Sequence, residues 1–427
     1  MAWHRRLGVA LLALVFASAS AADGFVHSLR LQPMYEHSEL SAGPANPDNR
    51  LAQLPSRRAS LELRPELAYR DDWLELRARP RLRAQMSAQS QPDGATRERT
   101  ATAYLNEWRA GLNPGRDWQL WAGREVMAWG PAQSLSPSNP FFTDSGRTHP
   151  YRELGGRDFI GLTWWGPAGV TASVLDNVRL GRDELAPLES FQPLRVVKLD
   201  RAGRHSYWSV NAAWPGRGDQ DAAPDRVGGY LQANLGEALL LYTELGLYRQ
   251  RTQQLPAYDR QLGWHFAAPA ADGPAGLGLV GAAYTLAAGP TLTLEYLHNS
   301  QGWDAAQAAD FGALLADAGA RLGAGGQEAG LAALTLAQAV QPGSVLLRRH
   351  YLFAQYRQPD VLPRLDLILQ AHHNLDDRGT RWASTVEWRS ASRWRLFGMG
   401  LVNTGAADSE ARLYLERQWL VGGNLRI

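Results

Sequence analysis

The chain is 427 residues long and nearly neutral, with 44 Lys and Arg against 42 Asp and Glu. This balance argues against a nucleic-acid partner, because nucleic-acid-binding proteins usually carry an excess of basic residues. The sequence contains no Cys, which excludes both a disulfide framework and a thiolate metal site. We therefore predict a fold without covalent cross-links, and we expect neither a cofactor nor a metal ion.

Residues 1–21 have the organisation of a secretory signal peptide. A basic start at 4–6 precedes an apolar stretch at 7–16, and small residues at 19–21 form a cleavage site. The apolar stretch is only about 10 residues long, whereas a spanning helix needs roughly 20. No apolar run of that length follows, so we expect an exported domain over 22–427 without a transmembrane helix.

Residues 60–86 alternate between apolar and polar side chains with a period of two, around a turn at Asp71-Asp72. The apolar set is Leu61, Leu63, Leu67, Tyr69, Leu74, Leu76, Ala78, Leu82, Ala84 and Met86. A period of two places each set on one face of a β-strand, and these strands are about twice the usual ~5–6 residues. One apolar and one ionic face is typical of a membrane barrel, in which apolar side chains meet lipid and polar ones line a wet lumen.

The same alternation recurs along the chain and predicts an all-β fold. The predicted strands run near 24–35, 58–70, 73–87, 99–112, 118–129, 157–165, 169–179, 194–201, 205–214, 226–235, 238–250, 277–287, 291–299, 345–357, 364–374, 380–389, 393–402 and 411–427. Connections after even-numbered strands are short, and most of those after odd-numbered strands are long, among them 88–98. Short periplasmic turns and long outer loops are typical of a transmembrane antiparallel up-and-down barrel. We predict about 18 strands, with 16 as the alternative, and both termini on the periplasmic side.

Charged residues on the polar faces are the candidates for lining the lumen. They are Glu62, Arg64, Glu66, Arg77, Arg79, Arg81, Arg83, Arg381, Glu387, Arg389, Arg412 and Glu416. A two-residue turn at Asp71-Asp72 would make Glu66 face Arg77, Arg64 face Arg79 and Glu62 face Arg81. Opposite charges across strands stabilise the pairing, and Arg79 and Arg83 would then lack acidic partners. The row is either a self-compensated ion ladder or a basic track that favours anions.

The loop Gly130–Gly156 follows the strand predicted at 118–129 and is long enough to be functional. Folded inward, it would narrow the lumen and place four residues at the constriction. These are Arg147, His149, Arg152 and Glu153. The alternative is a cap that lies over the rim. In the preceding strand the alternation puts Arg124 toward lipid, and a β-bulge would return it to the lumen.

A second long connection, 300–344, is rich in Ala. Within it, apolar residues recur at helical spacing: Phe311, Leu314, Leu315, Ala318 and Leu322. This spacing predicts one or two short helices in an outer loop. The loop could act as a lid or a plug, or it could be an ordered surface loop that shields the mouth.

Two short stretches carry a resemblance to known proteins. Gly123-Arg124-Glu125 with Trp129-Gly130, followed by Ser136-Pro137-Ser138-Asn139-Pro140, looks like a pattern in alginate-export-type barrels. It is also similar to a Trp-Gly-Pro…Ser-x-Asn-x-Pro stretch of capsule-assembly barrels, from which it departs because Asn139 and Pro140 are adjacent. The whole architecture resembles Gram-negative outer-membrane porins and exporters, and this resemblance implies a cell outer-membrane location.

We therefore expect a porin-like channel for passive diffusion of small hydrophilic solutes, with carboxylates and acidic sugars as anionic candidates. The alternative is a barrel with a closed lumen that exports or anchors surface polysaccharide. Expected partners are outer-membrane lipid and lipopolysaccharide, the solute or polysaccharide, and the barrel-assembly machinery; the oligomeric state is left open. The scattered His residues form no nucleophile–base set, so we do not expect an enzyme.

Overall fold

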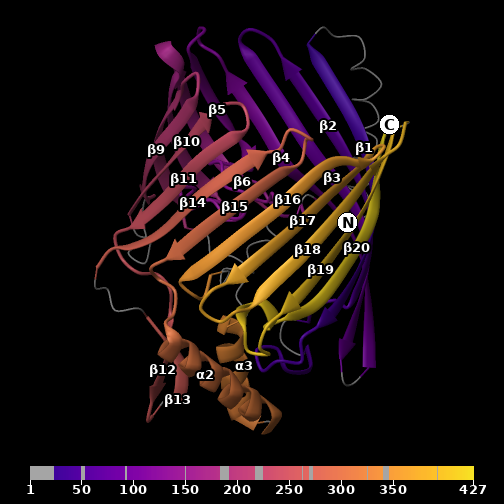
Figure 1. Cartoon of the computed structure of the whole chain (residues 1–427), viewed down its shortest axis with the longest axis vertical. Coiled ribbons are helices and arrows are strands. Elements are labelled where there is room, and N and C mark those ends of the chain that lie inside the picture. The colour runs from indigo at the N-terminus through magenta and orange to yellow at the C-terminus, as the bar shows by residue number, and fades with distance from the viewer. Residues whose placement is uncertain are drawn as a thin grey trace, which may run out of the picture.

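The computed structural model describes residues 24–427 except 50–52, 92–93, 150, 183–191, 217–224, 262, 269–272, 325, 340–345 and 392. Eighteen strands form one antiparallel sheet, which closes because β1 pairs with both β2 and β20 (Figure 1). Each predicted strand has a counterpart in this sheet, so the predicted barrel is confirmed. The predicted signal peptide, 1–21, lies outside the described residues.

The barrel strands follow one another around the ring in chain order. They are β1 (Phe25–Leu40), β2 (Arg57–Arg70), β3 (Leu74–Gln91), β4 (Gly94–Leu112), β5 (Trp118–Glu125), β6 (Arg157–Trp165), β7 (Val170–Arg179), β8 (Leu194–Ala202), β9 (Ser206–Pro215), β10 (Arg226–Leu235), β11 (Leu239–Tyr248), β14 (Ala275–Thr285), β15 (Thr291–Asn299), β16 (His350–Leu362), β17 (Leu365–Asn374), β18 (Thr380–Arg389), β19 (Trp394–Thr404) and β20 (Leu415–Arg426). The strand predicted at 118–129 ends early, at Glu125.

The two faces of the wall differ in chemistry as the alternation predicts. Leu61, Leu120 and Leu294 are exposed on the outer face, whereas Glu62 and Glu295, which directly follow two of these leucines, are buried inside. A contiguous apolar surface this large is unfavourable in water and is stabilised by lipid. Among the described residues, no helix is long and apolar enough to cross a membrane.

The two ends of the barrel differ in the length of their connections. The long connections share one end with the helices α2 (Ala305–Ala324) and α3 (Gly326–Ala339) and with the hairpin of β12 (Leu255–Asp259) and β13 (Gly263–Ala267) (Figure 1). We call this the outer end, and the other the short-turn end. The prediction of a long loop at 88–98 is wrong, because β3 and β4 stay paired up to Gln91 and Gly94. The pairing of β3 with β4 therefore continues beyond the end of the apolar alternation at Met86.

The loop between β15 and β16, 300–349, contains the predicted helices and supplies most of an apolar core at the outer end. Phe311, Leu314 and Leu315 of α2 pack with residues of α3 and with Trp303. Leu413 falls within the last predicted strand, 411–427, but is buried in this cluster instead. The short helix η5 (Glu410–Arg412) delays the start of β20 to Leu415, so Leu413 lies in a loop. The β12–β13 hairpin was not predicted, because its strands are short and lack a clear alternation.

Candidate functional site

The connection between β5 and β6, residues 126–156, lies inside the barrel, and we call it the inward loop. It bonds to β11 and β15 through its first half and to β3 and β18 through its second half. Because β3 and β11 lie far apart around the ring, the loop must cross the interior to reach both. It therefore folds into the lumen rather than capping the rim.

Two buried carboxylates hold the first half of the loop. Glu244 of β11 accepts hydrogen bonds from the Ala132 backbone N–H (2.9 Å) and from the hydroxyls of Ser136 (2.9 Å) and Ser138 (2.8 Å). Glu295 of β15 likewise accepts bonds from Gln133 and Ser134 backbone N–H groups and from the Tyr242 hydroxyl (2.6 Å). Hydrogen bonds to ionised acceptors are roughly twice as strong as neutral ones, so these two residues anchor the loop firmly.

Glycines in the wall let the loop backbone lie directly against it. Gly228 of β10 and Gly246 of β11 are cross-strand partners. A Cβ atom at Gly228 would lie 2.6 Å from the Ser138 carbonyl oxygen, and one at Gly246 would lie 2.2 Å from the Pro137 carbonyl oxygen. Both separations are far below van der Waals contact, so only glycine fits at these two positions.

The second half of the loop is fixed to the other side of the barrel. Arg81 of β3 donates to both carboxylate oxygens of Glu153, with Nε 3.0 Å from each. Tyr151 stacks on Phe397 of β19 with ring centroids 3.5 Å apart, and its hydroxyl donates to Glu387 of β18. The loop is thus tied at both flanks and bridges the lumen.

The motif at 136–140 has a structural role inside the loop. Ser136 and Ser138 bind Glu244, as described above. Asn139 Nδ2 donates to the Met127 carbonyl (2.6 Å), and its Oδ1 accepts from the Phe141 backbone N–H (2.9 Å). The side-chain amide thereby closes a turn that places Phe141 against Phe159 of β6, at 4.8 Å between ring centroids.

The four predicted constriction residues take different roles. Arg147 donates to the loop's own carbonyls of Ala132 (2.6 Å) and Gly130 (2.9 Å), so it stabilises the loop. Arg152 forms an ion pair with Asp144, and both side chains remain about half exposed. His149 Nδ1 accepts the Arg152 backbone N–H (3.1 Å), and burial together with that arginine lowers the pKa of His149. Glu153 is paired with Arg81.

The β2–β3 register differs from the predicted one by two residues, because Glu62 lies opposite Arg83 rather than Arg81. The cause is the turn. Asp71 Oδ1 accepts the backbone N–H groups of Trp73 (2.9 Å) and Leu74 (2.7 Å), which makes a longer turn than Asp71-Asp72 alone. A shift of two keeps every side chain on its predicted face but changes its cross-strand partner.

The predicted ion pairs of this hairpin are therefore wrong. The observed pairs are Glu62 with Arg64 (2.5 Å) and Arg83, Glu66 with Arg30 and Arg79 (3.8 Å), Arg77 with Glu125 (2.6 Å), and Arg79 with Glu107 (2.8 Å). Arg79 and Arg83 were predicted to lack acidic partners, and both have them. The row is a compensated ladder whose ion pairs involve the five strands β1 to β5 rather than two.

Five further candidates lie toward the two ends of the barrel. Arg381 Nε donates to Asn403 (3.1 Å), Glu387 accepts from Tyr151, and Arg389 pairs with Asp360 (2.7 Å) and Asp366 (2.9 Å). Arg412 was predicted on the last strand, which is wrong, because it lies in η5 and pairs with Glu416 (2.7 Å).

Arg124 stays on the outer face of β5, because β5 pairs with β6 in continuous register and has no bulge. Its guanidinium pairs with Asp158 (2.7 Å) and donates to the carbonyls of Leu105 (3.0 Å) and Gly181 (2.8 Å). These partners compensate its charge beside the apolar surface.

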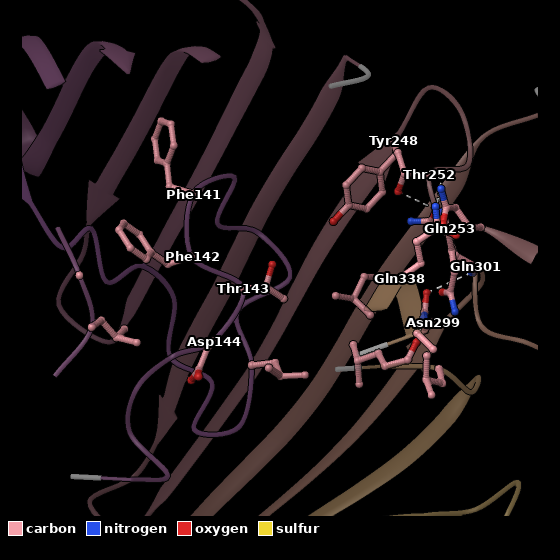
Figure 2. Close-up of a pocket in the computed structure, with 18 of the residues that line it drawn as sticks. Phe141, Phe142, Thr143, Asp144, Tyr248, Thr252, Gln253, Asn299, Gln301 and Gln338 are labelled. Carbon is pink, nitrogen blue, oxygen red and sulfur yellow. Dashed lines mark hydrogen bonds between the residues drawn. The ribbon is translucent and has the colours of Figure 1, made fainter. Parts of the chain in front are cut away.

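Two cavities border the inward loop. The larger, about 1050 Å³, lies between the loop and the helices and is called the outer vestibule (Figure 2). The second, about 450 Å³, lies between the loop and strands β15 to β19. Asp144 and Arg152 line both, so their ion pair stands where the two spaces meet.

A third cavity, about 660 Å³, lies at the short-turn end and is rich in arginine. Its basic residues are Arg30, Arg389, Arg393, Arg395 and Arg426, and its acidic lining residue is Glu66. We call it the arginine mouth. Of these arginines, Arg393 and Arg426 have no ion-pair partner in the described part of the chain. The arginine mouth therefore carries net positive charge.

Sequence reasoning missed the residues that anchor the inward loop. In the sequence, Glu244 and Glu295 look like ordinary lumen-facing residues. The alternation shows which face of the strand a side chain occupies, but it does not show which residue that side chain contacts. A usable signal was present for the wall: Gly228-Gly229 and Gly246 interrupt two otherwise well-formed strands, and glycine in a strand marks a close approach of another backbone.

No protein-family model and no curated protein matches this sequence. Among solved structures, the chain is similar to OccAB1 of Acinetobacter baumannii, with a TM-score of 0.56 and 11% identity over 96% of this chain and 99% of that one. It is also similar to OccK5 (OpdH) of Pseudomonas aeruginosa, with a TM-score of 0.50 and 9% identity over 95% and 99% of the two chains. A mutant of the Rh. blastica porin aligns with a TM-score of 0.45 and 10% identity over 94% and 100%. The similarities to the OccAB1 and OccK5 structures show that the chain shares their barrel fold.

Proposed function

We propose that this protein is an outer-membrane channel through which small hydrophilic solutes diffuse passively, without catalysis. The observation that carries the proposal is the inward loop, which is fixed to the wall on several sides and is bordered by cavities. A polar inner face and an apolar outer face support a water-filled path through lipid. The signal-peptide-like segment 1–21 supports export, after which the barrel-assembly machinery would insert the chain.

The motif at Gly123–Pro140 supports, as a further part of the proposal, a relation to alginate-export-type or capsule-assembly-type barrels. In this protein the motif residues hold the inward loop against Glu244. A loop held in this way sets the width of the path, whatever the solute.

We place the preference for anions in the arginine mouth rather than in the row of arginines at 60–86, where the sequence indicated it. Arg79 and Arg83 are compensated by acidic partners. The arginine mouth has an excess of positive charge, which lowers the barrier for anions and raises it for cations. We propose a modest anion preference that arises at this mouth.

Planar-bilayer recording tests the channel. The purified protein should produce stepwise conductance in KCl, and a silent barrel would contradict the proposal and favour the closed-lumen role in polysaccharide export or attachment. In a KCl gradient, the double variant Arg393→Glu with Arg426→Glu should shift the reversal potential toward cations. Arg204→Glu, at an exposed turn outside the arginine mouth, is the matched control. An equal shift in both variants would contradict the anion preference.

A further inference from the structure

We propose that the outer vestibule is a binding site for a neutral oligosaccharide, which is held there before it passes the inward loop. The inference deepens the proposed channel function and rests on it for the passage step. The binding step stands on the vestibule alone and is argued from its two walls.

One wall of the vestibule is made of amides and hydroxyls. Figure 2 shows Tyr248, Thr252, Gln253, Asn299, Gln301 and Gln338 gathered on one side, opposite Phe141, Phe142, Thr143 and Asp144 of the inward loop. This wall comes from the loops after β11 and β15 and from α3. Among its described lining residues none is charged, so it presents neutral polar groups only.

Several of these amides have hydrogen-bonding capacity to spare. Gln301 Oε1 accepts the backbone N–H groups of Thr252 (2.6 Å) and Gln253 (3.3 Å), which orients the side chain and leaves its two N–H donors available. The side-chain amides of Gln253, Gln254 and Gln338 have no hydrogen-bond partner within the described residues. A carboxamide offers two donors and one acceptor. A sugar hydroxyl both donates and accepts, so such groups match it on both counts.

The opposite wall supplies the apolar surface that a sugar ring needs. Phe142 and Leu154 of the inward loop line it, and Leu180 extends it. The C–H faces of a pyranose ring are apolar and pack against such side chains. A cavity lined mostly by apolar groups with a few polar ones is typical of small-molecule sites of about 300–1,000 Å³. The vestibule, at about 1050 Å³, has room for more than one sugar ring.

The charges of the vestibule favour a neutral ligand over an ionic one. Asp144 is paired with Arg152, and Glu153 with Arg81. The guanidinium of Arg157 lies over the Phe142 ring (5.3 Å), and that of Arg182 over the Tyr104 ring (4.2 Å). At Arg152 an anion would have to compete with Asp144, which is already in place, whereas a neutral saccharide displaces no ion pair.

The experiment measures binding and passage separately, with maltotriose as the probe. Trp303 lines the vestibule, so titration of the detergent-solubilised protein with maltotriose should change its tryptophan fluorescence in a saturable way. The same sugar should interrupt the bilayer current. The double variant Gln253→Ala with Gln338→Ala should weaken both effects about tenfold, since it removes two amide partners. Gln261→Ala removes an exposed amide from the same outer region but outside the vestibule, and it should match wild type.

Failure of this inference is distinguishable from failure of the channel proposal. If wild type conducts in KCl but maltotriose changes neither current nor fluorescence, the saccharide site is wrong and the channel stands. The site is also wrong if the double variant binds as wild type does, or if trigalacturonate binds more tightly than maltotriose. If the protein is silent in bilayers but fluorescence shows saturable binding lost in the double variant, the site stands and the channel proposal falls.

Discussion

The inward loop and the outer helical loop both leave the outer end of the barrel, yet they are held by opposite kinds of interaction. The inward loop is fixed by buried carboxylates, hydroxyls and an arginine of the wall. The loop 300–349 packs α2 on α3 around an apolar cluster that also includes Ala45 and Leu413. The difference follows from what each loop covers: the lumen wall is polar and offers hydrogen-bonding partners, whereas above the rim a segment must bury its own apolar surface to stay ordered.

The largest expected effect is the loss of the ion pair between the inward loop and β3. Arg81 is only 2% exposed, so Glu153→Ala leaves a buried positive charge without its partner. Breaking a buried pair in this way costs about 3–5 kcal/mol. Hydrogen exchange should show faster exchange across residues 151–156, and the channel should become noisier.

The matched control for that experiment is Asp225→Ala, which removes an exposed pair with Arg249. Exposed pairs contribute about 0–1 kcal/mol, so little should change. The double variant Arg81→Ala with Glu153→Ala should recover part of the loss, because no unpaired charge remains. Equal effects of Glu153→Ala and Asp225→Ala would show that polar anchoring is not what holds the inward loop.

The outer helical loop should respond to loss of apolar volume instead. Leu314 of α2 is 0% exposed at the centre of the apolar cluster. Truncation of a buried leucine costs about 2–5 kcal/mol, so Leu314→Ala should loosen α2 and α3, as measured by amide exchange over 305–339. Leu331→Ala, at a 58% exposed position of α3, is the control and should change little. A change in the exchange of the inward loop in Leu314→Ala would contradict the separation of the two regions.

Much of the fold could be predicted from the sequence, because it depends on a local rule. The period of two at 60–86 gives the face of each side chain regardless of its partner, and loop lengths give the order of the two ends. The cross-strand partner of each residue could not be predicted in this way. It depends on the length of the β2–β3 turn, and the side chain of Asp71 extends that turn in a way that alternation does not reveal. A shift of two residues leaves the alternation intact, so the pattern contains no sign of it.

The candidate site was predictable only in outline. Loop length indicated the segment 130–156 as functional, and its charged residues were identified. Glu244 and Glu295 could not be assigned, since their role depends on contacts across more than one hundred residues of sequence. The location of the arginines without acidic partners was predicted wrongly for the same reason. Arg79 pairs with Glu107 of the neighbouring strand β4, whereas the uncompensated positive charge lies in the arginine mouth at the short-turn end.

A smaller effect should follow from a single methyl group in the wall that the inward loop touches. In Gly246→Ala the new Cβ would lie 2.2 Å from the Pro137 carbonyl oxygen, so the loop backbone must move. Overpacking of this kind costs about 1–3 kcal/mol. The single-channel conductance should change and the tryptophan near-UV circular dichroism should shift. Gly278→Ala is the control, because its nearest neighbour would be 3.6 Å away, an ordinary contact. If both variants conduct alike, the position of the inward loop does not depend on Gly246.

The smallest expected effect is a pH dependence confined to the outer loop. Glu410 of η5 accepts hydrogen bonds from the Tyr351 hydroxyl (2.7 Å), Asn374 Nδ2 (3.0 Å) and the Leu347 backbone N–H (3.3 Å), so it joins η5 to the end of the helical loop. Burial raises the pKa of Glu410 from 4.5 to about 7; the neighbouring Asp377 adds to the shift, and Arg381 opposes it.

A raised pKa means that the folded form binds more protons than the unfolded form between pH 4.5 and 7. The stability of this junction therefore rises as pH falls through 7, is complete below 4.5, and is lowest above 7, where the buried carboxylate is charged. Amide protection over 346–351, corrected for intrinsic exchange, should be greater at pH 5.5 than at pH 8. Glu410→Gln should remove the dependence, and Glu328→Gln, exposed on α3, should keep it. If Glu410→Gln keeps the dependence, another group titrates, and Glu410 is not the source of the pH dependence of this junction.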